Sequence, residues 1–206
     1  MRKLYFKNLR LEMGAGGRFV VRLVSYIFYG SLAAACFVML FAELEFMRSA
    51  GVFLLLFLMD RLIHIDKAEE PLAHMPDEGR INLDIYLAPS ALAVLEKAVE
   101  KTYLLGGSFS QWMARQCLTR PEIKSDLRKF GVRWQDVDKK AKEIIKQEQK
   151  NKEVKRATKK ETLLLAEKLA KTAYRLAVLK NNKYIDVGNL FAALDNCSVV
   201  GLDNGD

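Results

Sequence analysis

The chain has 206 residues, of which 33 are basic and 25 acidic, so its formal net charge is +8. Half of the residues are apolar, which excludes a disordered chain, and 28% are charged, which excludes a bundle made only of membrane helices. The three cysteines, Cys36, Cys117 and Cys197, have neither disulfide nor zinc-site spacing, which favours a reducing cytosol.

The first 22 residues are predicted to form a basic cytoplasmic segment, because they hold six basic residues and a single acidic one, Glu12. Within this segment, residues 2–13 place basic side chains on one helical face and Phe6, Leu9 and Met13 on another. That pattern is typical of a short interfacial helix on anionic lipid. Residues 14–17, which include three glycines, are expected to end it.

Residues 23–42 contain no charged side chain. Twenty residues of α-helix span about 30 Å, the thickness of a bilayer's hydrocarbon core, so this run predicts a transmembrane helix. One alternative is a buried core helix, which would normally show a polar face. The other is a signal peptide or a lipoprotein signal ending at Cys36, although no A-x-A cleavage site precedes a plausible mature start.

A second apolar segment, residues 46–65, is marginal for a complete span, because its uncharged core covers only eleven residues. Near its end, Asp60 lies four residues before His64, which favours local pairing at a membrane interface; a proton or ion site at Asp60 is the competing interpretation. Basic residues flank residues 23–65 on both sides, whereas the connection holds only Arg48. The charges therefore predict a transmembrane hairpin in the cytoplasmic membrane with both termini cytoplasmic.

Residues 66–82 are polar and contain two prolines, which predicts a linker, and a soluble domain, residues 83–206, follows it. This domain repeats itself with a period of 75 residues. Each repeat begins with a long helix that carries five core-facing positions. In the first repeat these are Ala91, Val94, Leu95, Ala98 and Thr102, and in the second they are Ala166, Leu169, Ala170, Ala173 and Ala177.

Each long helix is followed by a turn, an aromatic residue and a shorter apolar helix. The aromatic residues are Phe109 and Tyr184, and the shorter helices are expected at residues 112–118 and 190–194. The small residues on the long helices predict close helix-on-helix packing. In the first repeat a closing helix, residues 122–130, is expected to pack on the long helix through Ile123, Leu127 and Phe130.

Residues 182–194 contain the pattern Tyr-Ile-x-x-x-x-Leu, and residues 123–132 end in Leu-x-x-x-Gly-Val. Together with the repeat and with the Ala-x-x-x-Ala spacing of Ala173 and Ala177, these features resemble the Clp N-terminal domain. That domain is the tandem Clp repeat in front of the ATPase rings of bacterial unfoldases. The resemblance covers about residues 83–200, with repeats at about 87–132 and 158–200.

The resemblance implies an all-α module that docks client proteins or adaptor proteins for an ATP-dependent unfoldase or protease, without chemistry of its own. Many family members carry a Glu-His pair before the apolar run, but here Gly188 and Asn189 stand at those positions. In the first repeat the register slips by a residue or two, and Ser110, Gln111 and Trp112 again supply no carboxylate. The departure argues against recognition of phosphorylated arginine through an acidic pocket.

Between the repeats, an amphipathic helix is predicted from Trp134, Val137, Ala141, Ile144 and Ile145. Residues 139–160 hold ten basic and three acidic residues. This run suits a solvated connector or a patch for lipid headgroups or nucleic acid. Because no aromatic residues are interleaved for stacking, the connector is favoured and nucleic acid is not expected as a partner. The competing function is a membrane-anchored scaffold that binds anionic lipid or nucleic acid through this run.

The sequence assigns no catalytic, cofactor-binding or metal-binding residue, and the substrate-binding residues stay unassigned. It contains no Walker motif, and its two histidines, His64 and His74, lack ligand or triad spacing. Trp112, Trp134 and the methionines are expected in the core or facing the membrane, with one or two of them lining a peptide groove between the repeats as the alternative. The second repeat is predicted to be one helix short, because residues 197–205 are a poor helix sequence.

The missing helix would leave Leu169, Ala173 and Leu190 uncovered. The chain is therefore expected to be part of a longer subunit with a downstream AAA+ ring, or to pair with a partner chain.

Overall fold

The computed structural model describes residues 2–63, 67–150 and 158–199. The chain divides into two compact units, which are described separately. The first, here called the helical unit, comprises Met1–Leu11 and Ala68–Asp206, and the second, the hairpin unit, comprises Glu12–Lys67. The protein is mostly helical, and both ends of the hairpin unit continue into the helical unit.

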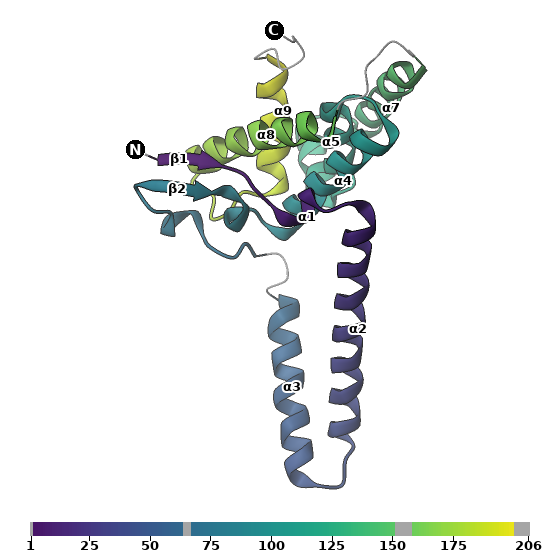
Figure 1. Cartoon of the computed structure of the whole chain (residues 1–206), viewed down its shortest axis with the longest axis vertical. Helices are drawn as coiled ribbons and strands as arrows, with labels where there is room; N and C mark the ends of the chain where they lie inside the picture. The colour runs from purple at the N-terminus through teal and green to yellow at the C-terminus, as the bar shows by residue number, and fades with distance from the viewer. Residues whose placement is uncertain (1, 64–66, 151–157, 200–206) are drawn as a thin grey trace. The chain divides into compact units, whose positions relative to one another are not determined.

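The hairpin unit consists of two antiparallel helices, α2 (Ala15–Leu40) and α3 (Glu45–Ile63), joined by a short turn (Figure 1). Helix α2 begins eight residues before the predicted apolar run, directly after Gly14. The expectation that residues 14–17 end a helix is wrong, because Gly16 and Gly17 lie inside α2. With 26 residues, α2 is about 39 Å long, more than a hydrocarbon core requires.

The expected interfacial helix over residues 2–13 is also wrong. Residues Arg2–Tyr5 form strand β1, which pairs in parallel with β2 (Gly79–Asn82). Only Leu9–Glu12 are helical, as the short helix α1, and Asn8 caps it by accepting hydrogen bonds from the backbone N–H groups of Arg10 and Leu11 at 2.8 and 3.2 Å. Leu11 belongs to the hydrophobic core, so this segment folds as part of the helical unit.

The predicted linker is likewise folded. It contains the 3₁₀ helix η1 (Leu72–His74) and strand β2, and a second 3₁₀ helix, η2 (Leu83–Tyr86), follows it. Met75 and Ile81 are buried, and the backbone N–H of Leu72 donates a hydrogen bond to the carbonyl of Lys183 at 2.9 Å. Burial of apolar side chains and a distant backbone partner make residues 68–82 part of the helical unit instead of a linker.

The long helices of the two repeats are α4 (Pro89–Leu105) and α8 (Lys159–Leu179). All ten predicted core positions, five on each helix, are at most 2% exposed, so the 75-residue pattern of burial is confirmed. The predicted ends are confirmed too. Gly106 and Gly107 adopt positive φ after α4, Thr158 and Glu161 form a capping box at the start of α8, and Asn181 adopts φ 52° after it.

The shorter helices are α5 (Phe109–Cys117) and α9 (Val187–Val199). Their buried residues match at a spacing of 77, two more than the period, as the predicted register slip requires. These residues are Trp112, Met113 and Gln116 in α5 and Asn189, Leu190 and Ala193 in α9. Phe109 and Tyr184 are not equivalent, because Phe109 opens α5 whereas Tyr184 lies before α9 begins.

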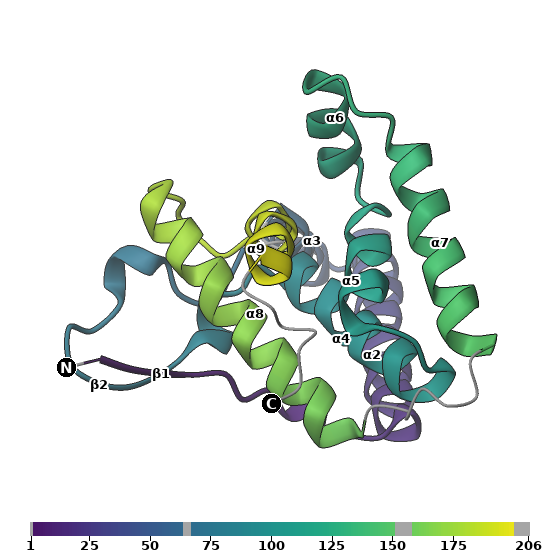
Figure 2. The same cartoon turned by 90° about the horizontal axis from the view of Figure 1, so that it is seen from above.

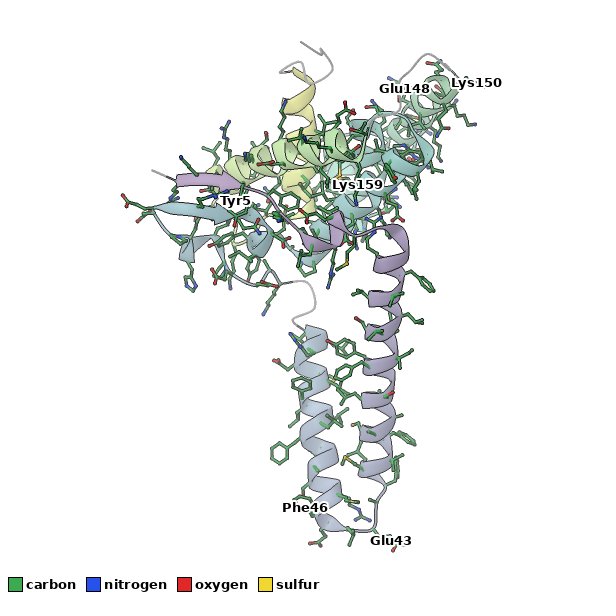
Figure 3. The ribbon with its side chains drawn as sticks, viewed as in Figure 1. Tyr5, Glu43, Phe46, Glu148, Lys150 and Lys159 are labelled. Atoms are coloured by element: carbon green, nitrogen blue, oxygen red, sulfur yellow. The ribbon has the colours of Figure 1, made fainter. Side chains whose placement is uncertain are left out.

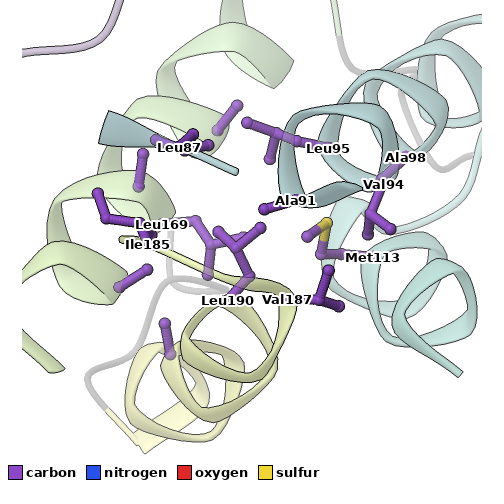
Figure 4. Close-up of a cluster of buried hydrophobic side chains, with 14 of the residues drawn as sticks. Leu87, Ala91, Val94, Leu95, Ala98, Met113, Leu169, Ile185, Val187 and Leu190 are labelled. Carbon is purple, nitrogen blue, oxygen red and sulfur yellow. The ribbon is translucent and has the colours of Figure 1, made fainter. Parts of the chain in front are cut away.

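One hydrophobic core joins the four helices of the two repeats (Figure 4). Ala91 and Leu95 of α4 lie there with Met113 of α5, Leu169 of α8 and Leu190 of α9. The small residues of α4 and α8 allow the close approach that the sequence predicted, because alanine side chains occupy little space between helix backbones.

The first repeat continues with α6 (Pro121–Lys129) and α7 (Trp134–Lys150). Helix α7 runs alongside α5 and buries Ala141 and Ile145, so the predicted connector belongs to the packed unit (Figure 2). Helix α6 mainly contacts α7 and α9, whereas it was expected on the long helix of its own repeat. Its apolar stripe packs only in part, because Ile123 is buried but Phe130 is 82% exposed.

The predicted uncovered patch on the second repeat is wrong, because Leu169, Ala173 and Leu190 are all buried. Strand β1 and η2 contact α8, so the segments on either side of the hairpin supply cover that a closing helix was expected to give. Helix α9 extends to Val199, and the rest of the predicted missing helix falls on residues 200–206, outside the described residues.

Candidate membrane hairpin and docking surface

Helix α2 is the one described helix that is long and apolar enough to cross a membrane, by length and composition. Within its apolar stretch, Gly16–Leu40, an 18-residue segment has a mean hydropathy of 2.0, and only 6% of that segment is buried. A core helix of a soluble protein would be mostly buried. The low burial of α2 therefore favours a lipid-facing helix over a core helix. It does not distinguish a membrane anchor from an N-terminal signal sequence, which has the same length and composition.

Helix α3 carries Arg48 near its start and Asp60 and Arg61 near its end, and it does not qualify as a span by the same measure. Its central side chains are nevertheless apolar and exposed. The hairpin unit holds 24 of the 34 large apolar side chains that are exposed among the described residues. Such a concentration marks a surface that meets lipid or a partner protein.

The two helices of the hairpin approach each other most closely at Gly51, which is buried. A Cβ atom at this position would lie 2.9 Å from the backbone nitrogen of Leu40 and 3.0 Å from the Cβ of Met39. The thiol of Cys36 donates to the carbonyl of Gly51 at 3.4 Å, and Arg48 Nε donates to the carbonyl of Ala42 at 2.8 Å beside the turn. Glu43 and Phe46 mark that turn in Figure 3.

Replacing Gly51 by leucine is expected to separate α2 from α3, because the contacting atoms include helix backbone that cannot move aside. Cys36, buried at this contact, would then react faster with a maleimide in detergent micelles. The matched control is Gly30→Leu, since nothing lies within 4 Å of a Cβ built on Gly30. In a Cys197→Ser chain, equal Cys36 labelling rates for both variants would contradict the close helix contact.

Trp112, a predicted core or groove residue, belongs to the core. Its ring lies between the cationic groups of Lys101 and Arg115, each 5.2 Å from the ring centre, and its Nε1 donates to the carbonyl of Gly106 at 2.8 Å. Trp134 is half-buried and contacts Lys124, whose Nζ is 4.4 Å from the ring centre. Both tryptophans are therefore engaged within the helical unit and do not line a groove.

The positions where the Clp family carries its Glu-His pair have structural roles here. Asn189 is buried, and its Oδ1 accepts hydrogen bonds from the backbone N–H of Asp186 and from Asn182 Nδ2, both at 3.1 Å. Asp186 in turn accepts from the backbone N–H of Asn189 at 2.8 Å. In the first repeat, the hydroxyl of Ser110 contacts that of Ser108 at 2.7 Å. Asp186 and Asn189 therefore cap the start of α9.

Two pairs of exposed apolar residues occupy equivalent places in the two repeats. Tyr103 and Leu104 lie in the last turn of α4, and Val178 and Leu179 lie in the last turn of α8, 75 residues later. Their side chains are between 49% and 81% exposed. We call these four residues the repeat-end pairs. Sequence analysis missed them, although Leu104-Leu105-Gly106 and Val178-Leu179-Lys180 stand just where each predicted helix ends.

The charge of the chain lies in the helical unit, which has 28 basic and 20 acidic residues, whereas the hairpin unit has five of each. Asp138 of α7 binds Lys142 at 2.5 Å and Arg115 at 3.1 Å. Burial opposes ionisation of this carboxyl, but the hydrogen bonds from the two cations outweigh burial and lower the pKa of Asp138. The network fixes α7 against α5.

No group of described residues combines three or more metal-ligating side chains. Asp60 lies near the end of α3, but its predicted neighbour His64 lies outside the described residues. Cys117 is buried, and burial raises the pKa of its thiol to about 12, which suits a structural residue and not a nucleophile. Chemistry at these side chains therefore receives no support.

The arrangement offers surfaces for contact: the apolar hairpin unit, the repeat-end pairs and the basic face of α7. No family model, no curated protein and no solved structure matches this chain.

Proposed function

We propose that this chain is a membrane-tethered docking module of the Clp-repeat kind, which holds client or adaptor proteins for an ATP-dependent unfoldase at the cytoplasmic face of the membrane. The observation that carries the proposal is the recurrence, 75 residues apart, of five buried positions on each long helix with an exposed apolar pair at its end. The module docks proteins and has no chemistry of its own.

The hairpin unit is the membrane anchor in this proposal. Its support is the mostly exposed apolar surface of α2 and α3. Strand β1 precedes the hairpin, β2 follows it, and the two strands pair directly, which supports a topology with both ends of the hairpin on the same side of a membrane. A chain that crosses through α2 therefore has to return through residues 41–67, which makes α3 the returning segment despite its polar ends.

The repeat-end pairs are the docking sites in this proposal. Exposed apolar side chains at the ends of two equivalent helices can bind the apolar segments that unfolded clients display, and burying one such side chain contributes about 1.5–3 kcal/mol. Lys101 stands near the first pair in sequence, and Lys180 and Lys183 near the second, which favours clients with acidic residues beside their apolar segments.

Replacing both residues of a repeat-end pair by serine is expected to weaken client binding at least about tenfold, because two buried apolar contacts are lost. Binding is measured by fluorescence anisotropy of a labelled, permanently unfolded protein, with the full chain in lipid nanodiscs. The variant Val178→Ser/Leu179→Ser is compared with Lys160→Ser/Lys168→Ser, which changes two exposed lysines of the same helix away from the pair.

The proposal fails if the full chain binds no unfolded protein. It fails also if the α8 serine variant and its control bind equally well and the corresponding Tyr103→Ser/Leu104→Ser variant loses nothing either.

A further inference from the structure

The outer face of α7 carries a row of lysines. Lys139, Lys142, Lys146 and Lys150 follow one another at intervals of three or four residues, so they share one side of the helix. All four are exposed, whereas Ala141 and Ile145 on the opposite side are buried against the helical unit. We call these four residues the lysine row.

Few acidic residues offset this face, and one of them, Asp138, pairs with Lys142. Of the two between residues 139 and 150, Glu148 is turned toward the helical unit, where its Oε2 accepts a hydrogen bond from the backbone N–H of Ser108 at 2.6 Å. That leaves Glu143 beside the row. Residues 139–160 as a whole carry a net charge of +7, nearly all of the +8 of the chain. Figure 3 shows Glu148 and Lys150 at the end of α7.

The helix itself is held firmly enough to present the row as a fixed surface. Gln149 Nε2 donates to the carbonyl of Leu105 at 3.0 Å, Glu148 binds the start of α5, and Asp138 is held by Arg115. Lys142 shares Asp138 with Arg115, but the other three lysines of the row extend beyond that network. The basic charge is therefore ordered along an exposed helix of the folded unit.

We propose that the lysine row docks the helical unit on the anionic headgroups of the membrane that the hairpin unit enters, an inference that rests on the proposed membrane insertion. The occupant follows from charge and from attachment. A row of lysines binds an anionic surface. The helical unit is connected to the membrane hairpin on both sides of the hairpin in sequence, so the membrane surface stays near the row at a millimolar effective concentration. Near an anionic surface, each lysine strengthens binding about fivefold.

Nucleic acid fits the row less well, because the described part of α7 places no exposed aromatic ring among the four lysines on which a base could stack. An acidic protein segment would match the charge, but nothing holds it at high local concentration. The experiment below therefore also tests an oligonucleotide and an acidic peptide as ligands of the row.

The experiment measures acetylation of individual lysines by mass spectrometry on the full chain reconstituted in vesicles. Neutral phosphatidylcholine vesicles are compared with vesicles that contain 30 mol% phosphatidylglycerol (about physiological anionic content), at low and at high salt. In anionic vesicles at low salt, the lysine row should react at least about fivefold more slowly, and high salt should restore the rate. Lys168 of α8 and Lys180 just after that helix serve as internal references, and their reactivity should not change.

The variant Lys146→Glu/Lys150→Glu should abolish the protection of Lys139 and Lys142, whereas the control Lys168→Glu/Lys180→Glu should leave it intact. Equal reactivity of the row in neutral and anionic vesicles would overturn the inference. So would protection by an added oligonucleotide or acidic peptide when anionic vesicles give none.

Extraction at alkaline pH separates this inference from the proposed anchor. A chain that is released from neutral vesicles but still shows row protection on anionic ones contradicts the hairpin anchor and keeps the lysine row. A chain that resists extraction but shows no protection contradicts the lysine row and keeps the anchor.

Discussion

Replacing Leu11 by alanine should lower the free energy of unfolding of the helical unit by about 2–5 kcal/mol, the usual cost of a leucine-to-alanine change in a packed core. Leu11 is 1% exposed and belongs to the same hydrophobic cluster as Ile81, Leu83 and Tyr86. Its loss would leave a cavity where the segment before the hairpin joins the unit. If residues 2–13 formed an interfacial helix on lipid instead, Leu11→Ala would change the free energy of unfolding only slightly.

The matched control is Leu9→Ala in the same short helix, because Leu9 is 68% exposed. Its effect should stay within about 0.5 kcal/mol. Unfolding of the full chain in detergent by urea is followed through the fluorescence of Trp112 and Trp134, both of which lie in the helical unit. Equal destabilisation by the two variants would show that residues 2–11 do not belong to the core.

At neutral pH, Cys117 should react with an electrophile about a thousandfold more slowly than a thiol of ordinary pKa, because its thiolate fraction is about a thousandfold smaller. Burial raises the pKa of this thiol from 9.0 to about 12, and three units of pKa are a thousandfold in thiolate fraction. Because burial favours the neutral thiol, the raised pKa of Cys117 contributes to the free energy of unfolding, and this contribution is complete below pH 9. That contribution is lost as the pH rises from about 9 to about 12.

Alkylation of Cys117 by iodoacetamide at pH 8, read by mass spectrometry on a Cys197→Ser chain, tests this directly. The native chain should remain unmodified at Cys117 for as long as it stays folded, and urea should make that cysteine react at the rate of a free thiol. A native rate close to the unfolded rate would contradict the packing of α5 in the core.

The helices of the repeats were predictable because their signals are local. Pro89 at a helix start, Gly106-Gly107 at its end and the capping box of Thr158 and Glu161 each act within a few residues of the chain. The core positions followed from helical periodicity, since small and apolar residues recur on one face of α4 and α8.

The strand pair was not predictable for the opposite reason. Arg2–Tyr5 and Gly79–Asn82 are four residues each and pair across a separation of 77 residues. No periodicity in so short a segment distinguishes a strand from one turn of helix. Arg2 pairs with Asp77, and the Arg80 side chain stacks on the Tyr5 ring.

Two of the candidate surfaces were predictable from the sequence, and the third was not. The apolar run of α2 and the basic run after Lys139 are compositional, so the sequence predicted both. The repeat-end pairs depend on which side chains remain uncovered, and that is decided by how the neighbouring helices pack. Likewise the expected exposure of Leu169 and Leu190 was wrong because it assumed that only a closing helix could cover them. Instead β1 and η2 lie against α8, and α4, α5 and α6 lie against α9.

Three introduced cysteines, tested one at a time, show whether the hairpin unit crosses a membrane and returns. Cysteine is introduced in a Cys197→Ser chain at Lys3 before the hairpin, at Glu43 in its turn or at Lys168 after it, and sealed vesicles are treated with a membrane-impermeant maleimide. Positions 3 and 168 should be labelled from one side of the membrane, and position 43 only from the other side. The reason is that β1 and β2, which flank the hairpin in sequence, pair with each other. Labelling of positions 3 and 168 from opposite sides, or of all three from one side, would contradict this topology.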